Sequence, residues 1–92
     1  ESPALRVIEE LEKTGADVIY YDPWVRQYRF KGQERVSEPE LTEELIESAD
    51  LVMITAAHTN VDYKLVQRHA KAVFDTKNVM KNIENRENIE VL

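Results

Sequence analysis

Leu51-Val52-Met53-Ile54-Thr55 is an almost continuous apolar run of strand length. Such a run is typical of a strand covered on both faces in a parallel sheet. Residues 72–75, with the sequence AVFD, predict a second buried strand. Between the two, Tyr63, Val66 and Ala70 recur at helical spacing and predict a short helix. A strand, a helix and a strand with short links favour a right-handed crossover within a parallel sheet.

Three further elements are predicted on the N-terminal side of this core. Ser2 and Pro3 are typical of an N-cap and a first helical residue, and the helical pattern that follows ends at residues 14–15, Thr-Gly. Residues 17–23, DVIYYDP, are rich in β-branched and aromatic residues and predict a strand that ends at its proline. Residues 40–48 predict a second helix with an apolar and an acidic face.

The remaining segments carry weaker patterns. Residues 24–35 are polar, basic and aromatic without a clear period and predict an exposed loop, and Val36 is expected in a brief edge strand. Residues 89–92 could add a small edge strand. Because the first helix has no strand before it, we expect a central strand ahead of Glu1. The predicted fold is α/β, a Rossmann-like parallel sheet with flanking helices in a single domain of residues 1–92 that lacks its first central strand.

Composition excludes several classes of function. The net charge of −6 argues against binding to DNA or RNA, and no apolar run approaches the roughly 20 residues of a membrane helix. The chain has no cysteine, so it holds no disulfide, thiolate metal site or cysteine nucleophile. No metal-ligand cluster or serine triad is visible. Gly15 and Gly32 lie outside any Gly-rich turn of the dinucleotide type, so this is not the usual half that holds NAD.

Ligands of open parallel sheets bind beyond the carboxyl ends of the strands, which selects three segments. These are Asp22 with Pro23, residues 55–58 with His58, and residues 75–78 with Asp75, Lys77 and Asn78. The helix start at Glu1 and Ser2 faces the same edge and offers free N–H groups to a phosphate or to the pyrophosphate of a dinucleotide.

Each candidate also has a structural interpretation. Asp22 could cap a turn before Pro23, and Asp75 with Asn78 could form a hydrogen-bonded turn. Lys77 adds a cation that such a turn does not require, which favours function. His58 could titrate near neutral pH or donate to a ligand oxygen, although a lone loop histidine is more often structural. His69, near a helix end, needs no further role.

Four motifs together resemble a known family. They are residues 1–5 (ESPAL), 21–23 (YDP), 48–52 (SADLV) and 75–79 (DTKNV), in this order. The chain resembles the C-terminal, UDP-binding domain of the UDP-glucose/GDP-mannose dehydrogenase family. Residues 58–63, HTNVDY, look nearest to the UDP-N-acetylhexosamine 6-dehydrogenases.

The resemblance implies the third part of an enzyme whose other parts are an NAD-binding Rossmann domain and a helical dimerisation region. Such enzymes oxidise the C6 alcohol of a UDP-sugar to a carboxylate by two hydride transfers to NAD, through a thiohemiacetal and a thioester on a cysteine upstream of this chain. This domain alone would not be catalytic. A cytoplasmic homo-oligomer that makes polysaccharide precursors is implied, with the upstream domains of the same chain as partners.

The position of these segments and the resemblance together assign substrate binding to Lys77, Asn78, Asp75 and His58. The helix start at Glu1 and Ser2 is expected to contact NAD, because its free N–H groups suit a pyrophosphate. Lys77 stands where the family pattern has an arginine, and residues 56–58, AAH, replace a Thr-Asp-His segment. A lysine presents a point charge in place of a forked donor, so bidentate contacts are in question at this position.

The alternative is a non-catalytic α/β module for regulation or oligomerisation. Its contact surface would be residues 24–35, where aromatic residues and arginines concentrate. A receiver-like version would require a phosphorylatable aspartate within a cluster of acidic residues.

Overall fold

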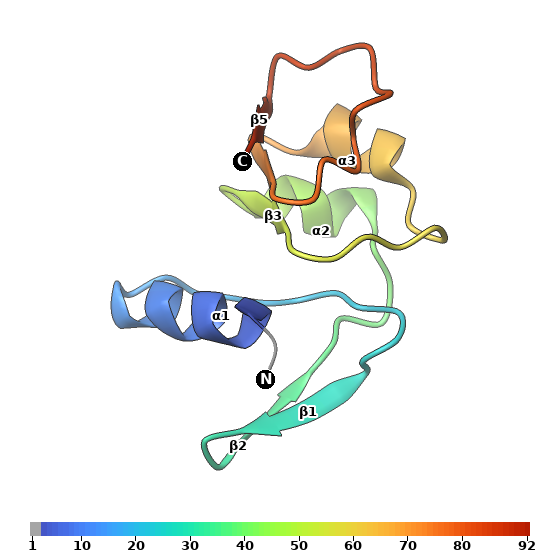
Figure 1. The fold of residues 1–92 in the computed structure, drawn as a ribbon. Helices are drawn as coiled ribbons and strands as arrows, with labels where there is room; N and C mark the ends of the chain where they lie inside the picture. Colours follow the sequence, from blue (N-terminus) through green and yellow to red (C-terminus); the bar gives the residue numbers. More distant parts are fainter. Residues whose placement is uncertain (1–2) are drawn as a thin grey trace. The chain divides into compact units, whose positions relative to one another are not determined.

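The computed structural model describes residues 3–92, and its contacts divide the chain into two units, Glu1–Leu41 and Thr42–Leu92 (Figure 1). No helix within residues 3–92 is long and apolar enough to cross a membrane. The single domain expected from the sequence stays a prediction. The first unit contains α1 (Pro3–Lys13), β1 (Gln27–Phe30) and β2 (Gln33–Val36), and the second contains α2 (Glu43–Ser48), β3 (Val52–Ile54), α3 (Tyr63–His69), β4 (Val73–Asp75) and β5 (Ile89–Val91).

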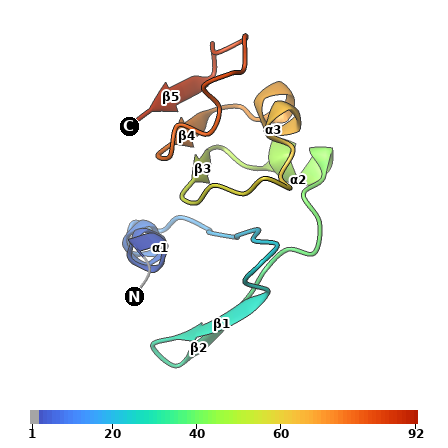
Figure 2. The same ribbon diagram turned by 45° about the vertical axis from the view of Figure 1, so that its right-hand side comes forward.

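A parallel sheet forms the centre of the second unit. Its strand order is β3-β4-β5, with Ile54 opposite Asp75 and Val73 opposite Ile89. Helices α2 and α3 contact each other and lie on the same side of this sheet (Figure 2). The α/β class and the parallel strands predicted from residues 51–55 and 72–75 are therefore confirmed.

Side chains at the helix ends define the limits of α2 and α3. The Thr42 hydroxyl accepts the N–H of Leu45 at 3.1 Å, which makes Thr42 the N-cap, so α2 begins at Glu43 and not at residue 40 as predicted. At the C-terminal end of α3, the Asn88 side-chain amide donates to the carbonyls of Gln67 and Ala70, both at 2.9 Å. Because Asn88 immediately precedes β5, this residue joins the last strand to the helix.

The core of the second unit is built from apolar side chains of four elements and of the segment after β4. Successive side chains of each strand point to opposite faces of the sheet, and the amphipathic helices cover one of these faces. Met80, which follows β4, is 0% exposed, as deeply buried as any strand residue. The buried apolar residues are Ile46, Ile54, Val66, Ala70, Val73 and Met80.

The first unit contains a hairpin where the sequence predicted a loop. Strands β1 and β2 pair antiparallel with Gln27 opposite Val36 and Phe30 opposite Gln33. The two residues between them, Lys31 (φ 51°) and Gly32 (φ 79°), both have positive φ, which is the backbone of the tight turn preferred in hairpins. The loop prediction for residues 24–35 was wrong over these strands, whereas the strand expected at Val36 is confirmed.

Residues 17–23 do not form the predicted strand. The Tyr20 carbonyl accepts the N–H of Glu38 at 2.9 Å, and the N–H of Asp22 donates to the Ser37 hydroxyl at 3.0 Å. The segment therefore bonds to the residues that follow the hairpin and joins no strand ladder. Residues 17–23 were expected to form a parallel strand together with residues 51–55 and 72–75. This expectation is corrected, because the third strand of the sheet that contains β3 and β4 is β5.

Ion pairs attach the hairpin to α1. The Arg35 guanidinium donates to both carboxylate oxygens of Glu12, at 2.6 and 2.5 Å, and the Lys31 ammonium pairs with Glu9. The hydrogen bonds from Arg35 lower the pKa of Glu12, and the hydrogen bond from Lys31 lowers that of Glu9. A lowered carboxyl pKa means that each pair favours the folded unit above the ordinary pKa of 4.5 and loses this effect as pH falls through the lowered value.

Replacing Met80 with alanine is expected to lower the free energy of unfolding by about 2–5 kcal/mol, because a fully buried side chain leaves a cavity. Met80→Leu nearly conserves the volume and should cost less than about 1.5 kcal/mol. Urea unfolding of both variants measures the difference. Equal losses in the two variants would mean that packing around Met80 does not contribute as the burial indicates.

Replacing Arg35 with glutamine is expected to raise the pKa of Glu12 towards its ordinary value of 4.5, since the Arg35 hydrogen bond is the main influence that lowers it. NMR shifts of the side-chain carboxyl carbon during a pH titration report this value. Glu9 is the internal control, because Lys31 holds it, and its pKa should not move. A common shift of both carboxyls would contradict the assignment.

Candidate functional site

The carboxyl ends of β3 and β4 lie at one edge of the parallel sheet. Ile54 and Asp75 end the two strands and face each other in the register. The next residue, Thr76, donates both its backbone N–H (3.1 Å) and its hydroxyl (2.6 Å) to the Ile54 carbonyl. The loop after β4 (residues 76–80, the β4 loop) is thereby hydrogen-bonded to the end of β3, next to the loop after β3 (residues 55–62, the β3 loop). Ligands of open parallel sheets bind at this position.

The carboxylate of Asp75 is completely buried and fully occupied by backbone donors. Its Oδ1 accepts the N–H groups of Lys77 (3.1 Å) and Val79 (3.2 Å), and its Oδ2 accepts that of Met80 (2.9 Å). This is the hydrogen-bonded turn that the sequence allowed as the structural interpretation of Asp75. A direct contact between this carboxylate and a substrate stays a prediction.

Lys77 and Asn78 are the exposed residues of this loop. Asn78 has φ 55°, a left-handed conformation that asparagine tolerates better than most residues. Within residues 3–92, no hydrogen bond or ion pair involves the ammonium group of Lys77. The loop therefore presents a cation and a side-chain amide, a pair suited to an anionic ligand with hydroxyl groups.

His58 lies in the neighbouring loop, after β3, and is half-buried. Its backbone N–H donates to the hydroxyl oxygen of Tyr63, the first residue of α3, at 3.0 Å. From the sequence, Tyr63 was predicted only as part of a helix face, and this contact was missed. An aromatic hydroxyl at the start of the helix that follows such a loop was the available signal.

The structure brings four of the predicted substrate-binding residues to one sheet edge, with Asp75 at the end of β4, Lys77 and Asn78 in the β4 loop, and His58 in the β3 loop. Asp22 belongs to the other unit, where its Oδ1 accepts the N–H groups of Trp24 and Val25 at 2.8 and 3.1 Å. This is the turn-capping arrangement that the sequence offered as the alternative for Asp22. The predicted cofactor contacts, Glu1 and Ser2, lie outside the described residues.

The described residues of this edge present a lysine, a side-chain amide and a histidine. Within the described part of the chain, no group of three or more histidine, cysteine, aspartate or glutamate residues could hold a metal ion. The negative charge of Asp75 is balanced by three N–H groups, and the exposed charge of the loop is that of Lys77. The β4 loop therefore exposes a positive charge to solvent.

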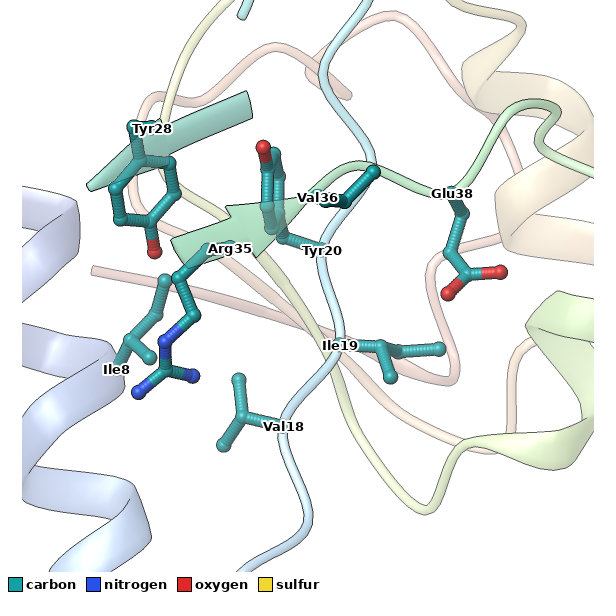
Figure 3. Close-up of a pocket in the computed structure, with 8 residues that line it drawn as sticks. All are labelled: Ile8, Val18, Ile19, Tyr20, Tyr28, Arg35, Val36 and Glu38. Carbon is teal, nitrogen blue, oxygen red and sulfur yellow. The ribbon is translucent and has the colours of Figure 1, made fainter. Parts of the chain in front are cut away.

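An open hollow in the first unit is a different kind of surface (Figure 3). Two tyrosine rings lie beside it, Tyr20 and Tyr28, with centroids 5.3 Å apart, and burial raises the pKa of both phenols. Two of its polar groups already have partners, since the Arg35 guanidinium is paired with Glu12 and the Tyr20 hydroxyl donates to the Val25 carbonyl at 3.1 Å. The hollow is lined by Ile8, Val18, Ile19, Tyr20, Tyr28, Arg35, Val36 and Glu38.

Comparison with protein families gives one match. A family model described as "UDP-glucose/GDP-mannose dehydrogenase family, UDP binding domain" matches residues 1–82, which include both loops of the sheet edge. No similar curated protein and no similar solved structure was found. The family match agrees with the resemblance seen in the four sequence motifs, and it favours a dehydrogenase domain over a non-catalytic module for regulation or oligomerisation.

Replacing Thr76 with valine is expected to lower the free energy of unfolding by about 0.5–1.5 kcal/mol, because the hydroxyl that donates to the Ile54 carbonyl is lost while the shape is kept. Thr76→Ser retains the hydroxyl and is the matched control. Chemical denaturation of the two variants gives the comparison. If serine costs as much as valine, the hydroxyl does not fasten the loop.

Proposed function

Because the chain belongs to the UDP-glucose/GDP-mannose dehydrogenase family, with residues 1–82 matching its UDP-binding domain, we propose that the edge formed by the β3 and β4 loops binds the UDP part of a nucleotide sugar. The observation that carries this proposal is the loop after β4, which exposes Lys77 and Asn78 where two parallel strands end. The enzyme that contains this domain is a nucleotide-sugar dehydrogenase.

Each residue has a role that follows from its chemistry. The Lys77 ammonium pairs with a phosphate oxygen, and the Asn78 amide donates to or accepts from sugar or ribose hydroxyls. The His58 ring, at the neighbouring loop, supplies a further hydrogen bond to the ligand. The family pattern has arginine where this chain has Lys77, so we expect one point-charge contact here in place of a forked, bidentate one.

The proposed reaction is the oxidation of the sugar C6 alcohol to a carboxylate with NAD, for polysaccharide precursors in the cytoplasm. Residues 3–92 do not fit NAD as its main site, since Gly15 follows α1 and Gly32 lies in the hairpin turn, and neither opens a helix after a strand. We therefore assign NAD mainly to the upstream domains of a homo-oligomeric enzyme, with Glu1 and Ser2 as proposed additional contacts, and we route no chemical step through residues of this chain.

A UDP-N-acetylhexosamine is the substrate that we propose within this class. The support is residues 58–63, HTNVDY, which resemble the enzymes for such sugars. In the structure these residues form the loop from His58 to the start of α3, held by the contact between the His58 N–H and Tyr63. We assign to this loop the distinction between one hexose and another.

Replacing Lys77 with alanine in the intact enzyme is expected to weaken UDP binding by about 10- to 100-fold, the range that corresponds to one charge-assisted hydrogen bond. Isothermal titration with UDP measures it, and NAD affinity should change much less. Lys77→Arg, which restores the family's forked donor, should bind UDP at least as tightly as the wild type.

Lys81→Ala is the matched control, because it removes another exposed lysine just beyond the same loop. It should leave UDP affinity within about twofold of the wild type, as expected when no direct contact is lost. Equal losses from Lys77→Ala and Lys81→Ala would point to a general charge effect and count against the proposed contact.

A further inference from the structure

We infer that Asp75 acts on ligand binding as a positioning residue: its buried carboxylate holds the loop that presents Lys77 and Asn78, and does not itself contact the ligand. This inference rests on the proposed function, because it concerns the same UDP-binding edge. It goes beyond the sequence motif, which groups Asp75 with its neighbours as one set of ligand contacts.

Burial distinguishes Asp75 from Lys77 and Asn78, which lie further along the loop. Its exposed fraction is 0%, whereas Lys77 and Asn78 are exposed. A buried carboxylate that has lost water must be compensated by hydrogen bonds from the protein. The three N–H groups of Lys77, Val79 and Met80 provide this compensation at 2.9–3.2 Å.

The same hydrogen bonds fix the backbone of Asn78. Its two neighbours in sequence, Lys77 and Val79, donate to one carboxylate oxygen, Oδ1. These two bonds bracket the residue whose φ is 55°, a conformation that costs a non-glycine residue free energy unless the surroundings hold it. The carboxylate therefore holds the loop backbone in the conformation in which the side chains of Lys77 and Asn78 are exposed.

The occupied N–H groups also define how the loop can recognise a phosphate. Successive backbone N–H groups in a turn with one left-handed residue often form an anion-binding nest. In this loop, three N–H groups from residues 77 to 80 bind the protein's own carboxylate. Because three of the four backbone N–H groups of residues 77–80 are occupied in this way, recognition of a ligand phosphate by this loop depends mainly on the side chain of Lys77 and, with it, on the anchor that orients it.

Both ends of the loop are anchored, so the carboxylate controls only the segment between them. Thr76 is bonded twice to the Ile54 carbonyl at one end, and Met80 is buried in the core at the other. Loss of the carboxylate should therefore release residues 77–79 without unfolding the sheet. This makes the positioning role separable from overall stability.

The test is a double-mutant cycle in the intact enzyme, with UDP affinity measured by isothermal titration for Asp75→Asn, Lys77→Ala and the double variant. Asp75→Asn keeps the shape but replaces one acceptor oxygen by a donor. We expect it to raise the Kd for UDP by about 3- to 10-fold, and we expect the double variant to bind within about twofold of Lys77→Ala alone. Additive losses would show that Asp75 contacts the ligand independently, and no loss in Asp75→Asn would show that the anchor is not needed, so either result overturns the inference.

Ile46→Ala is the control for stability, because it removes a buried side chain of α2 outside the loop. It should leave the Kd for UDP within about twofold of the wild type at a temperature where both proteins are folded. A loss equal to that of Asp75→Asn would mean that any destabilisation weakens binding, and would overturn the positioning role.

Amide hydrogen exchange separates failure of this inference from failure of the proposed function. Because the side chain of Asp75→Asn keeps only one acceptor oxygen, exchange should become faster at one or more of Lys77, Val79 and Met80, while exchange in β3 and β4 stays close to that of the wild type. Unchanged protection of the three amides overturns the inference whatever the ligand is. Lost protection together with no UDP binding by the wild-type protein would instead reject the proposed ligand.

Discussion

A carboxylate without access to water imposes the main constraint on the proposed binding edge of this domain. Asp75 ends β4 and is 0% exposed, so its charge must be compensated inside the protein. The chain meets this requirement by turning residues 77–80 back over the carboxylate, where three N–H groups reach it. The shape of the loop, and with it the place of the exposed lysine, follows from the need to satisfy one buried charge.

The parallel core was predictable because its signals are local and mutually consistent. Residues 51–55 and 72–75 are short apolar runs, a helical pattern lies between them, and this combination favours a parallel pair. The carboxyl ends of such a pair lie at one edge by geometry alone, so the neighbourhood of His58 and Lys77 also followed from the sequence. The family match to residues 1–82 agrees with the motifs on which these predictions depended.

What could not be predicted depended on partners that are distant in sequence. Residues 17–23 have strand composition, but composition does not identify a ladder partner, and their backbone bonds to Ser37 and Glu38. In residues 24–35, the charges hid a weak alternation around a Lys31-Gly32 turn, and ion pairs with α1 gave the arginine and lysine side chains their places. The role of Asp75 also depended on burial, which a motif does not report.

The last strand has a consequence for where this domain should be considered to end. The family match stops at residue 82, yet β5 (Ile89–Val91) is the third strand of the parallel sheet, and Asn88 bonds to the end of α3. A truncation at the boundary of the match would remove Asn88. The carbonyls of Gln67 and Ala70 would then lose their donor, and the N–H of Val73 would lose its acceptor, the Asn88 carbonyl. The parallel sheet thus extends beyond the matched segment, and an expression boundary drawn from the match alone would expose one side of β4.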